Sequence, residues 1–210
     1  MTNIEGEVHI VEFENGTYEG LLNKDGLMEG YGKFTYKSGA EYKGEYKNAL
    51  KNGRGIYTDP NGAIYEGCFK DGVSHGFGTY RYTSGAVYSG SWIDNKRSGL
   101  GVYTYPNGDI YDGEWLDSEM NGRGVYRYST GAVYEGEFKN GMSNGRGVFR
   151  YASGTIYEGE FKDNKKWGLG FERTPNGDSY EGEFKDGLKS GKGVSKRADG
   201  AISEGEFMTV

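Results

Sequence analysis

Cysteine, histidine, proline and long apolar runs are scarce in this chain of 210 residues. A single cysteine, Cys68, excludes an intrachain disulfide and is typical of a reducing compartment. The two histidines, His9 and His75, have no clustered Cys or Asp around them, so we predict no metal site and no cofactor. No apolar run approaches the roughly 18 residues of a membrane-spanning helix, and the N-terminus lacks a signal-peptide core. These features predict a cytoplasmic protein.

The charge balance argues against nucleic-acid binding, and the absence of known catalytic motifs argues against enzymatic activity. With 25 basic and 31 acidic residues the net charge is -6, which gives no electrostatic reason to bind nucleic acid. No phosphate-binding loop of the form Gly-x-x-x-x-Gly-Lys-Ser/Thr is present, and the many Gly-x-Gly pairs precede strands, not helices. The paired glutamates of YEGE recur along the chain as solvated positions. We therefore predict no catalytic residues and no enzymatic activity.

Glycine and aromatic residues are abundant, with 39 Gly, 19 Tyr and 10 Phe. The segment 132–151, AVYEGEFKNGMSNGRGVFRY, shows how they are used. In YEGEFK small or apolar residues alternate with charged ones, which is the period of a β-strand. The turn-forming residues 140–145 follow, and a second strand is expected to begin at Gly147. One unit is therefore a β-hairpin plus a turn to the next hairpin.

This unit repeats along nearly the whole chain. The first step between leading tyrosines is 24 residues and the next seven are 23 residues. The leading residues are Tyr18, Tyr42, Tyr65, Tyr88, Tyr111, Tyr134, Tyr157 and Tyr180, with Ser203 in the last position. The regular spacing excludes random low complexity as the reason for the high glycine content.

The repeated segments YEGEFK, YDGEWL, GRGVY and YPNG resemble the MORN-repeat family. The resemblance implies an elongated single-sheet rod that serves as a protein-interaction and assembly module, in a cytoskeletal or membrane-associated complex. Membrane binding is a further property that it implies. The basic-His-Gly that often precedes the Gly-x-Gly in the family is represented here only by Ser74-His75-Gly76.

The predicted fold class is all-β. We expect an elongated, single-layer, twisted antiparallel β-meander of tandem 23-residue β-hairpin (MORN) repeats, with about 18 strands. Residues 1–17 are predicted to form an N-terminal capping strand, residues 18–200 eight tandem MORN repeats, and residues 201–210 a C-terminal half repeat or capping strand.

One face of this sheet is predicted to carry the aromatic side chains. The leading tyrosine and the aromatic residue four positions later share a face, and the aromatic residues of the second strand point the same way. Rings that cover strand glycines would keep such a thin sheet rigid. The predicted partner-binding residues on this face are Trp92, Tyr103, Tyr105, Trp115, Tyr126, Tyr128, Phe138, Phe149 and Tyr151. The alternative is that these rings only pack on one another.

The opposite face mixes glutamates with basic side chains, and two interpretations stay open. Acidic and basic residues on neighbouring strands could form cross-strand ion pairs. Alternatively, a basic stripe could bind the phosphate groups of anionic phospholipids such as phosphoinositides. The residues predicted for lipid binding are Arg127, Arg150, Arg173 and Lys196.

The last two repeats lose the aromatic residues of their second strands, which become Glu172/Thr174 and Ser195/Arg197. This change is typical of a polar capping repeat, or of an end where a homodimer or a specific partner docks. Trp167 is expected in a turn, where an exposed Trp favours the interpretation that this end is an interface with a partner. The residues of this predicted end interface are Trp167, Phe171, Phe184 and Phe207.

The sequence therefore predicts a non-enzymatic scaffold that binds a protein partner, in the form of an extended or helical peptide, through an exposed aromatic face. A homodimer and a weak contact with an anionic membrane are the other predicted associations. Peripheral membrane association through anionic phospholipids is the alternative function.

Overall fold

The computed structural model describes residues 6–207, and the chain divides into two compact units, Met1–Pro106 and Asn107–Val210. The parts of the predicted terminal segments that fall on residues 1–5 and 208–210 lie outside the described residues. Strands of the first unit are β1 (His9–Phe13), β2 (Gly16–Leu22), β3 (Met28–Tyr36), β4 (Glu41–Lys47), β5 (Leu50–Thr58), β6 (Ile64–Lys70), β7 (Val73–Arg81), β8 (Val87–Ile93) and β9 (Lys96–Thr104). Those of the second unit are β10 (Ile110–Leu116), β11 (Glu119–Arg127), β12 (Val133–Lys139), β13 (Met142–Arg150), β14 (Ile156–Lys162), β15 (Lys165–Arg173), β16 (Ser179–Lys185), β17 (Leu188–Lys196) and β18 (Ile202–Phe207).

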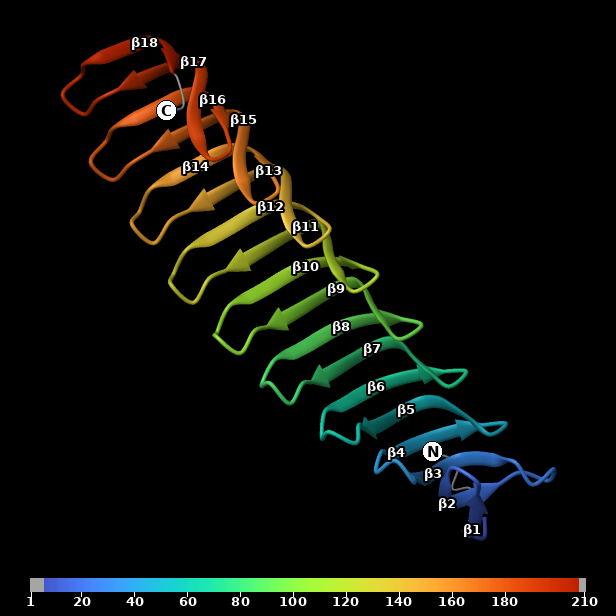
Figure 1. Ribbon diagram of the computed structural model, residues 1–210. Coiled ribbons are helices and arrows are strands. Elements are labelled where there is room, and N and C mark those ends of the chain that lie inside the picture. The colour runs from blue at the N-terminus through green and yellow to red at the C-terminus, as the bar shows by residue number, and fades with distance from the viewer. Residues whose placement is uncertain (1–5, 208–210) are drawn as a thin grey trace. The chain divides into compact units, whose positions relative to one another are not determined.

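Each unit is an antiparallel meander in which every strand pairs with its neighbours in the sequence (Figure 1). Residues 6–207 contain no helix, and the strands within each unit form one layer. The predicted all-β fold class, with β-hairpins as the repeated element, is confirmed. The division into capping segments and repeats stays a prediction.

The turn inside every hairpin after the first is shorter than the sequence suggested. In the repeat of β12 and β13 it consists of Asn140 and Gly141 alone, both at positive φ, 51° and 77°. Two consecutive residues at positive φ make a type I′ turn, whose twist matches that of the flanking strands. The second strand therefore begins at Met142, and the prediction that it begins at Gly147 is wrong.

Residues 142–146 belong to the strand because a β-bulge absorbs the extra turn formers. Gly136 pairs with Gly147, but Phe138 pairs with Ser143, so three residues of β13 lie opposite one residue of β12. In five of the repeats a glutamate contacts the left-handed glycine of the bulge, whereas Leu21, Cys68 and Ser91 take that place in the other three. In β11, the backbone N–H of Arg123 donates to Glu114 Oε1 over 2.8 Å, and a Cβ at Gly122 would lie 2.7 Å from Glu114 Cδ. The second glutamate of the repeat is thus a structural residue.

The additional residue of the first repeat lies in its turn. Between β2 and β3 the chain forms a longer loop, in which the Asn23 N–H donates to Leu27 O over 2.8 Å and the Gly26 N–H donates to Asn23 O over 3.0 Å. Gly26 has a φ of 74°. A longer loop of this kind leaves the strand register intact, which explains the 24-residue step.

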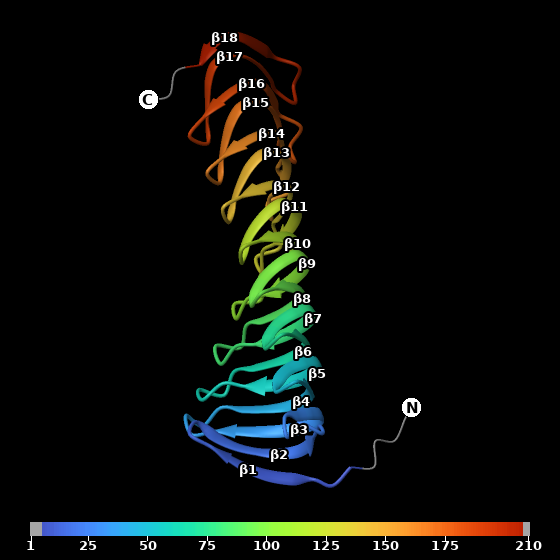
Figure 2. The same cartoon turned by 90° about the vertical axis from the view of Figure 1, so that its right-hand side faces the viewer.

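A row of glycines crosses the strands of each unit and lies under the aromatic layer. In the second unit Gly124 pairs with Gly136, and Gly136 pairs with Gly147. A Cβ at Gly147 would lie 2.6 Å from the Tyr134 hydroxyl oxygen, so the ring rests directly on the backbone. The strands bend instead of running flat (Figure 2), and this curvature lets a single layer bury its rings.

Candidate interaction surfaces

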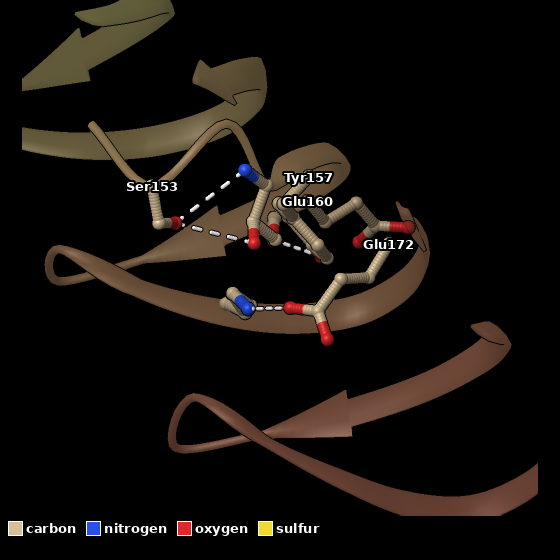
Figure 3. Close-up of polar contacts among 6 residues, drawn as sticks. Ser153, Tyr157, Glu160 and Glu172 are labelled. Atoms are coloured by element: carbon tan, nitrogen blue, oxygen red, sulfur yellow. Dashed lines mark hydrogen bonds and ion pairs between the residues drawn. The ribbon is translucent and has the colours of Figure 1, made fainter. Parts of the chain in front are cut away.

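The leading tyrosines form the buried layer of each unit. The Tyr134 ring is 1% exposed and packs edge-on against Phe138 at 5.1 Å and Phe161 at 4.8 Å between ring centroids. Its hydroxyl donates to the carbonyl oxygen of Glu137 over 2.9 Å. Figure 3 shows the equivalent bond from Tyr157 to Glu160, also 2.9 Å long. The same burial holds for Tyr18, Tyr42, Tyr65, Tyr88, Tyr111, Tyr157 and Tyr180.

Three of the residues predicted to contact a partner belong to this buried layer. Trp92 is 6% exposed, Trp115 is 5% exposed and Phe138 is 6% exposed. The indole N–H of Trp92 donates to the Gly78 carbonyl oxygen over 3.1 Å. The prediction that these three side chains form an exposed contact surface is wrong, because other rings pack against them: Tyr65 and Tyr88 against Trp92, and Tyr111 against both Trp115 and Phe138.

The other predicted contact residues remain partly accessible. They belong to what we call the outer ring rows, the aromatic side chains near the end of the second strand of each hairpin and at the position directly after it. The first unit carries Phe34, Tyr36, Tyr57, Tyr80, Tyr82, Tyr103 and Tyr105, and the second unit carries Tyr126, Tyr128, Phe149 and Tyr151.

Rings of an outer ring row contact one another along the strand and between hairpins. Centroids are 4.5 Å apart for Tyr126 and Tyr128, 5.7 Å for Tyr128 and Phe149, and 4.3 Å for Phe149 and Tyr151. Tyr128 is 36% exposed, and the other three rings are half-buried. Each row therefore offers a continuous edge of aromatic surface.

An ion pair ends the outer ring row of the second unit. Glu172 occupies the position that Phe149 has one repeat earlier, and Lys166 occupies that of Ser143. The Lys166 ammonium contacts the Glu172 carboxylate, as the dashed line at Glu172 in Figure 3 marks. Lys166 Nζ also lies 5.1 Å from the ring centroids of both Tyr151 and Tyr157. The sequence analysis did not identify Lys166. The signal was that Lys166 and Glu172 together replace the Ser and Phe of the preceding repeat.

The predicted end interface is not a single cluster. Trp167 lies within β15, paired with Glu160, so its prediction as a turn residue is wrong. It is partly buried, and Lys162 Nζ stands 4.6 Å from its ring. Phe184 is 3% exposed beneath Tyr157, and Phe207 packs on Tyr180. Phe171 faces the opposite side of the sheet, opposite Glu158. A homodimer through these residues stays a prediction.

One basic residue of the second face forms a cross-strand ion pair, Lys33 on β3 with Glu41 on β4, but the four residues predicted for lipid binding form none. Within residues 6–207, Arg127, Arg150, Arg173 and Lys196 are exposed and take part in no ion pair. The ion pairs of the described chain involve other residues, such as Lys33 and Lys43 with Glu41. The lipid-binding alternative for the four basic residues has no support from the comparisons below.

Burial shifts the pKa of several groups on the aromatic face. It raises the pKa of Tyr134 and Tyr157, and it raises the pKa of Tyr88 to about 12 although Arg97 acts in the opposite direction. It lowers the pKa of Lys51, whose Nζ lies 4.5 Å from the Tyr57 ring centroid. These groups are therefore held in their neutral form more strongly than in water.

The described residues hold neither a cluster of metal ligands nor a helix that could cross a membrane. Across residues 6–207 there is no group of three or more His, Cys, Asp or Glu side chains arranged to hold a metal ion. In the same residues, no helix has the length and apolar character needed to cross a bilayer.

Comparison of the sequence with family models gives one match. The model described as MORN repeat matches residues 18–41, 42–64, 65–87, 88–110, 111–133, 134–156, 157–179 and 180–202. These eight consecutive segments cover most of the chain and confirm the resemblance drawn from YEGEFK and GRGVY. No curated protein matches the chain.

Solved structures with a similar fold come from the protein CPAP. The wild-type TCP10 domain of Danio rerio CPAP is 14% identical, with a TM-score of 0.52 and 94% of each chain covered. The same domain in complex with a peptide of Danio rerio STIL is 13% identical, with a TM-score of 0.54 and 97% of each chain covered. The CPAP G-box domain, whose structure suggests a role in centriole elongation, is 14% identical with a TM-score of 0.50, covering 96% of this chain and 100% of that one. At these identities the likeness concerns the fold alone.

Proposed function

Because the chain belongs to the MORN-repeat family, we propose that it is a non-enzymatic protein-interaction module and that a peptide segment of its partner binds along an outer ring row. The observation that carries the proposal is the partial exposure of the outer rings after the leading tyrosines are buried. Aromatic side chains with accessible edges are the usual anchors of protein interfaces.

An extended peptide segment suits this surface better than a globular partner. Each outer ring row is a narrow edge one or two rings wide, which runs across the strands from hairpin to hairpin. The similar CPAP domain has been solved with a STIL peptide, which supports a peptide as the class of partner. By the same comparison, a cytoskeletal assembly in the cytoplasm is the setting that we propose.

Affinity capture with the intact chain tests the proposal. We expect proteins retained by the wild type to be lost when Tyr128 and Tyr151 are changed together to alanine, because the exposed ring edges disappear. Changing Arg127 and Arg150 to alanine serves as a matched control, since both lie in the same strands on the opposite face. Circular dichroism checks that each variant is folded. If the tyrosine variant retained the same proteins as the wild type, the outer ring row would not be the binding surface.

A further inference from the structure

The second face of the second unit carries a regular row of carboxylates and apolar side chains. Each member pairs with the next across neighbouring strands from β10 to β18. We call it the acid–apolar row, and its members in order are Asp112, Val125, Glu135, Val148, Glu158, Phe171, Glu181, Val194 and Glu204. Every second position is acidic without exception.

The fold does not require this regularity, although an acidic residue after the leading tyrosine belongs to the repeated segments YEGEFK and YDGEWL. The corresponding row of the first unit, in order, is Glu19, Lys33, Lys43, Ile56, Glu66, Thr79, Ser89 and Val102. Two of its members are lysines that form ion pairs with Glu41, and the polar Thr79 and Ser89 bond to each other. The same fold therefore tolerates quite different side chains here, and the fold does not explain why the second unit keeps carboxylates.

The carboxylates of the acid–apolar row are accessible and have no polar partner in the described chain. All five are exposed, and within residues 6–207 none forms an ion pair or a side-chain hydrogen bond. Phe171 is 40% exposed and Val194 38% exposed between them. Exposed apolar side chains that lie between polar ones are typical of interaction sites.

A groove follows the row and gives it depth. Its volume is ≈ 780 Å³, its floor is the backbone of the glycine row, and its walls include Val125, Val148 and Phe171. The carboxylates lining it are Asp112, Glu135, Glu137, Glu158 and Glu160, against the basic side chains Arg123 and Arg146. A smaller groove of ≈ 480 Å³ follows the same row at Glu181, Val194 and Glu204. Both grooves are predominantly acidic, so charge complementarity selects a basic occupant.

The spacing of the carboxylates defines the period of that occupant. Successive carboxylates stand two strands apart, about 9.6 Å at the usual strand separation of about 4.8 Å. An extended polyproline II segment rises about 3.1 Å per residue, so three residues span about 9.3 Å. Every third side chain of such a segment lies on the same face of the helix and therefore meets the next carboxylate.

We propose that the acid–apolar row docks an extended segment of a partner protein that carries Lys or Arg at every third position. The flanking basic residues Arg127, Arg150 and Arg173 lie two positions further along their strands. They confine the basic side chains of the segment to the line of the row. This surface lies on the opposite face from the outer ring rows, so the present proposal does not depend on the function proposed for those rows.

Fluorescence anisotropy with labelled peptides tests the proposal. The first peptide contains four Lys-Pro-Pro units, and the second contains four Lys-Pro-Pro-Pro units with the same charge and a mismatched period. We expect the first to bind the intact chain about five- to tenfold more tightly, since two or more exposed ion pairs of modest strength are lost with the wrong spacing. Equal affinity for the two peptides would reduce the row to a general polycation binder and overturn the proposal. An absence of binding by the first peptide at low salt would do the same.

Substitutions in the chain test whether the Lys-Pro-Pro peptide binds at the acid–apolar row. Changing Glu135 and Glu158 together to glutamine is expected to weaken binding of the Lys-Pro-Pro peptide about five- to tenfold. Changing Glu19 and Glu66 together to glutamine removes the same charge at equivalent positions of the first unit and is expected to leave the affinity unchanged. Unchanged affinity in the double variant contradicts the assignment. The Tyr128 and Tyr151 double alanine variant should bind this peptide like the wild type, which separates the two surfaces.

Discussion

At the scale of single residues, the fold depends on a tyrosine ring that rests on two glycines. Tyr134 lies over Gly136 and Gly147, and its hydroxyl bonds to the backbone at the bulge of its own strand. Neither glycine has space for a methyl group, because the ring and the facing backbone occupy it. The glycines of the repeat are therefore required by contact with the ring, in addition to any demand from the turns.

The glycine row offers a matched pair of substitutions. Gly147→Ala is expected to lower the free energy of unfolding by about 1–3 kcal/mol, because its Cβ would lie 2.6 Å from the Tyr134 hydroxyl oxygen. Gly205→Ala is expected to change it by less than about 0.5 kcal/mol, since nothing lies within 4 Å of its Cβ position and Ser203 stands where the tyrosine would be. Denaturant unfolding of the two variants measures the difference. An equal loss of unfolding free energy in both variants would show that contact with the tyrosine ring is not the reason for the glycine.

At the scale of the hairpin, the two-residue turn is the element that sets the strand register. Its first position is Asn or Asp in most repeats, and its second position is Gly in three of them, Gly72, Gly141 and Gly187. Other repeats place Ala49, Asn95, Ser118 or Asn164 there at positive φ, between 64° and 71°. A side chain with a Cβ is disfavoured in this region, most clearly for alanine, which has no polar group to compensate.

This difference predicts a stabilising substitution. Ala49→Gly is expected to raise the free energy of unfolding by about 1 kcal/mol, because it relieves the left-handed conformation at a φ of 64°. The reverse change, Gly141→Ala, is expected to lower it by about the same amount, since nothing lies within 4 Å of its Cβ position and only the conformation is affected. Thermal or denaturant unfolding measures both. A destabilised Ala49→Gly would mean that chain flexibility outweighs the strain.

At the scale of the whole molecule, the same tyrosine contact is repeated in every hairpin, so its small contributions to the free energy of unfolding add up. In tandem-repeat proteins stability is close to a sum of the repeats and of the contacts between neighbours. Leading tyrosines of both units share a raised pKa that has burial as its first cause, as for Tyr42, Tyr65, Tyr134 and Tyr157. The stability of the chain, which depends on all of these tyrosines, should therefore change steeply with pH in the range where they ionise.

Alkaline pH is expected to unfold the chain cooperatively. Below the usual tyrosine pKa of 10.0 both folded and unfolded chains keep the phenolic protons, and pH has no effect through these groups. Above it the unfolded chain releases protons that the folded chain retains, because Tyr88 titrates only at about 12. Stability therefore falls as pH rises beyond about 10. Ultraviolet absorbance of tyrosinate and circular dichroism, followed together, should show the buried tyrosines ionising only as the strands are lost.

Much of the fold could be predicted from local sequence. The alternation in YEGEFK, the spacing of the leading tyrosines and the family resemblance led to antiparallel hairpins and to a shared aromatic face, and these predictions are confirmed. The start of the second strand was misplaced because Asn144 and Gly145 have the composition of a turn. Only pairing with the opposite strand shows that they form a bulge, since register is a relation between strands.

The candidate surfaces were predicted less well, because exposure depends on residues of other repeats. Trp92, Trp115 and Phe138 are aromatic residues of the correct face, yet other rings pack against them. The acid–apolar row was not predicted for a related reason: neighbouring members are ten or thirteen residues apart in the sequence and come together only through the register. The sequence by itself determined the hairpin repeat and its family, since both rest on short-range patterns. The tertiary structure decided which rings stay accessible and which carboxylates align, because curvature and strand pairing bring distant residues together.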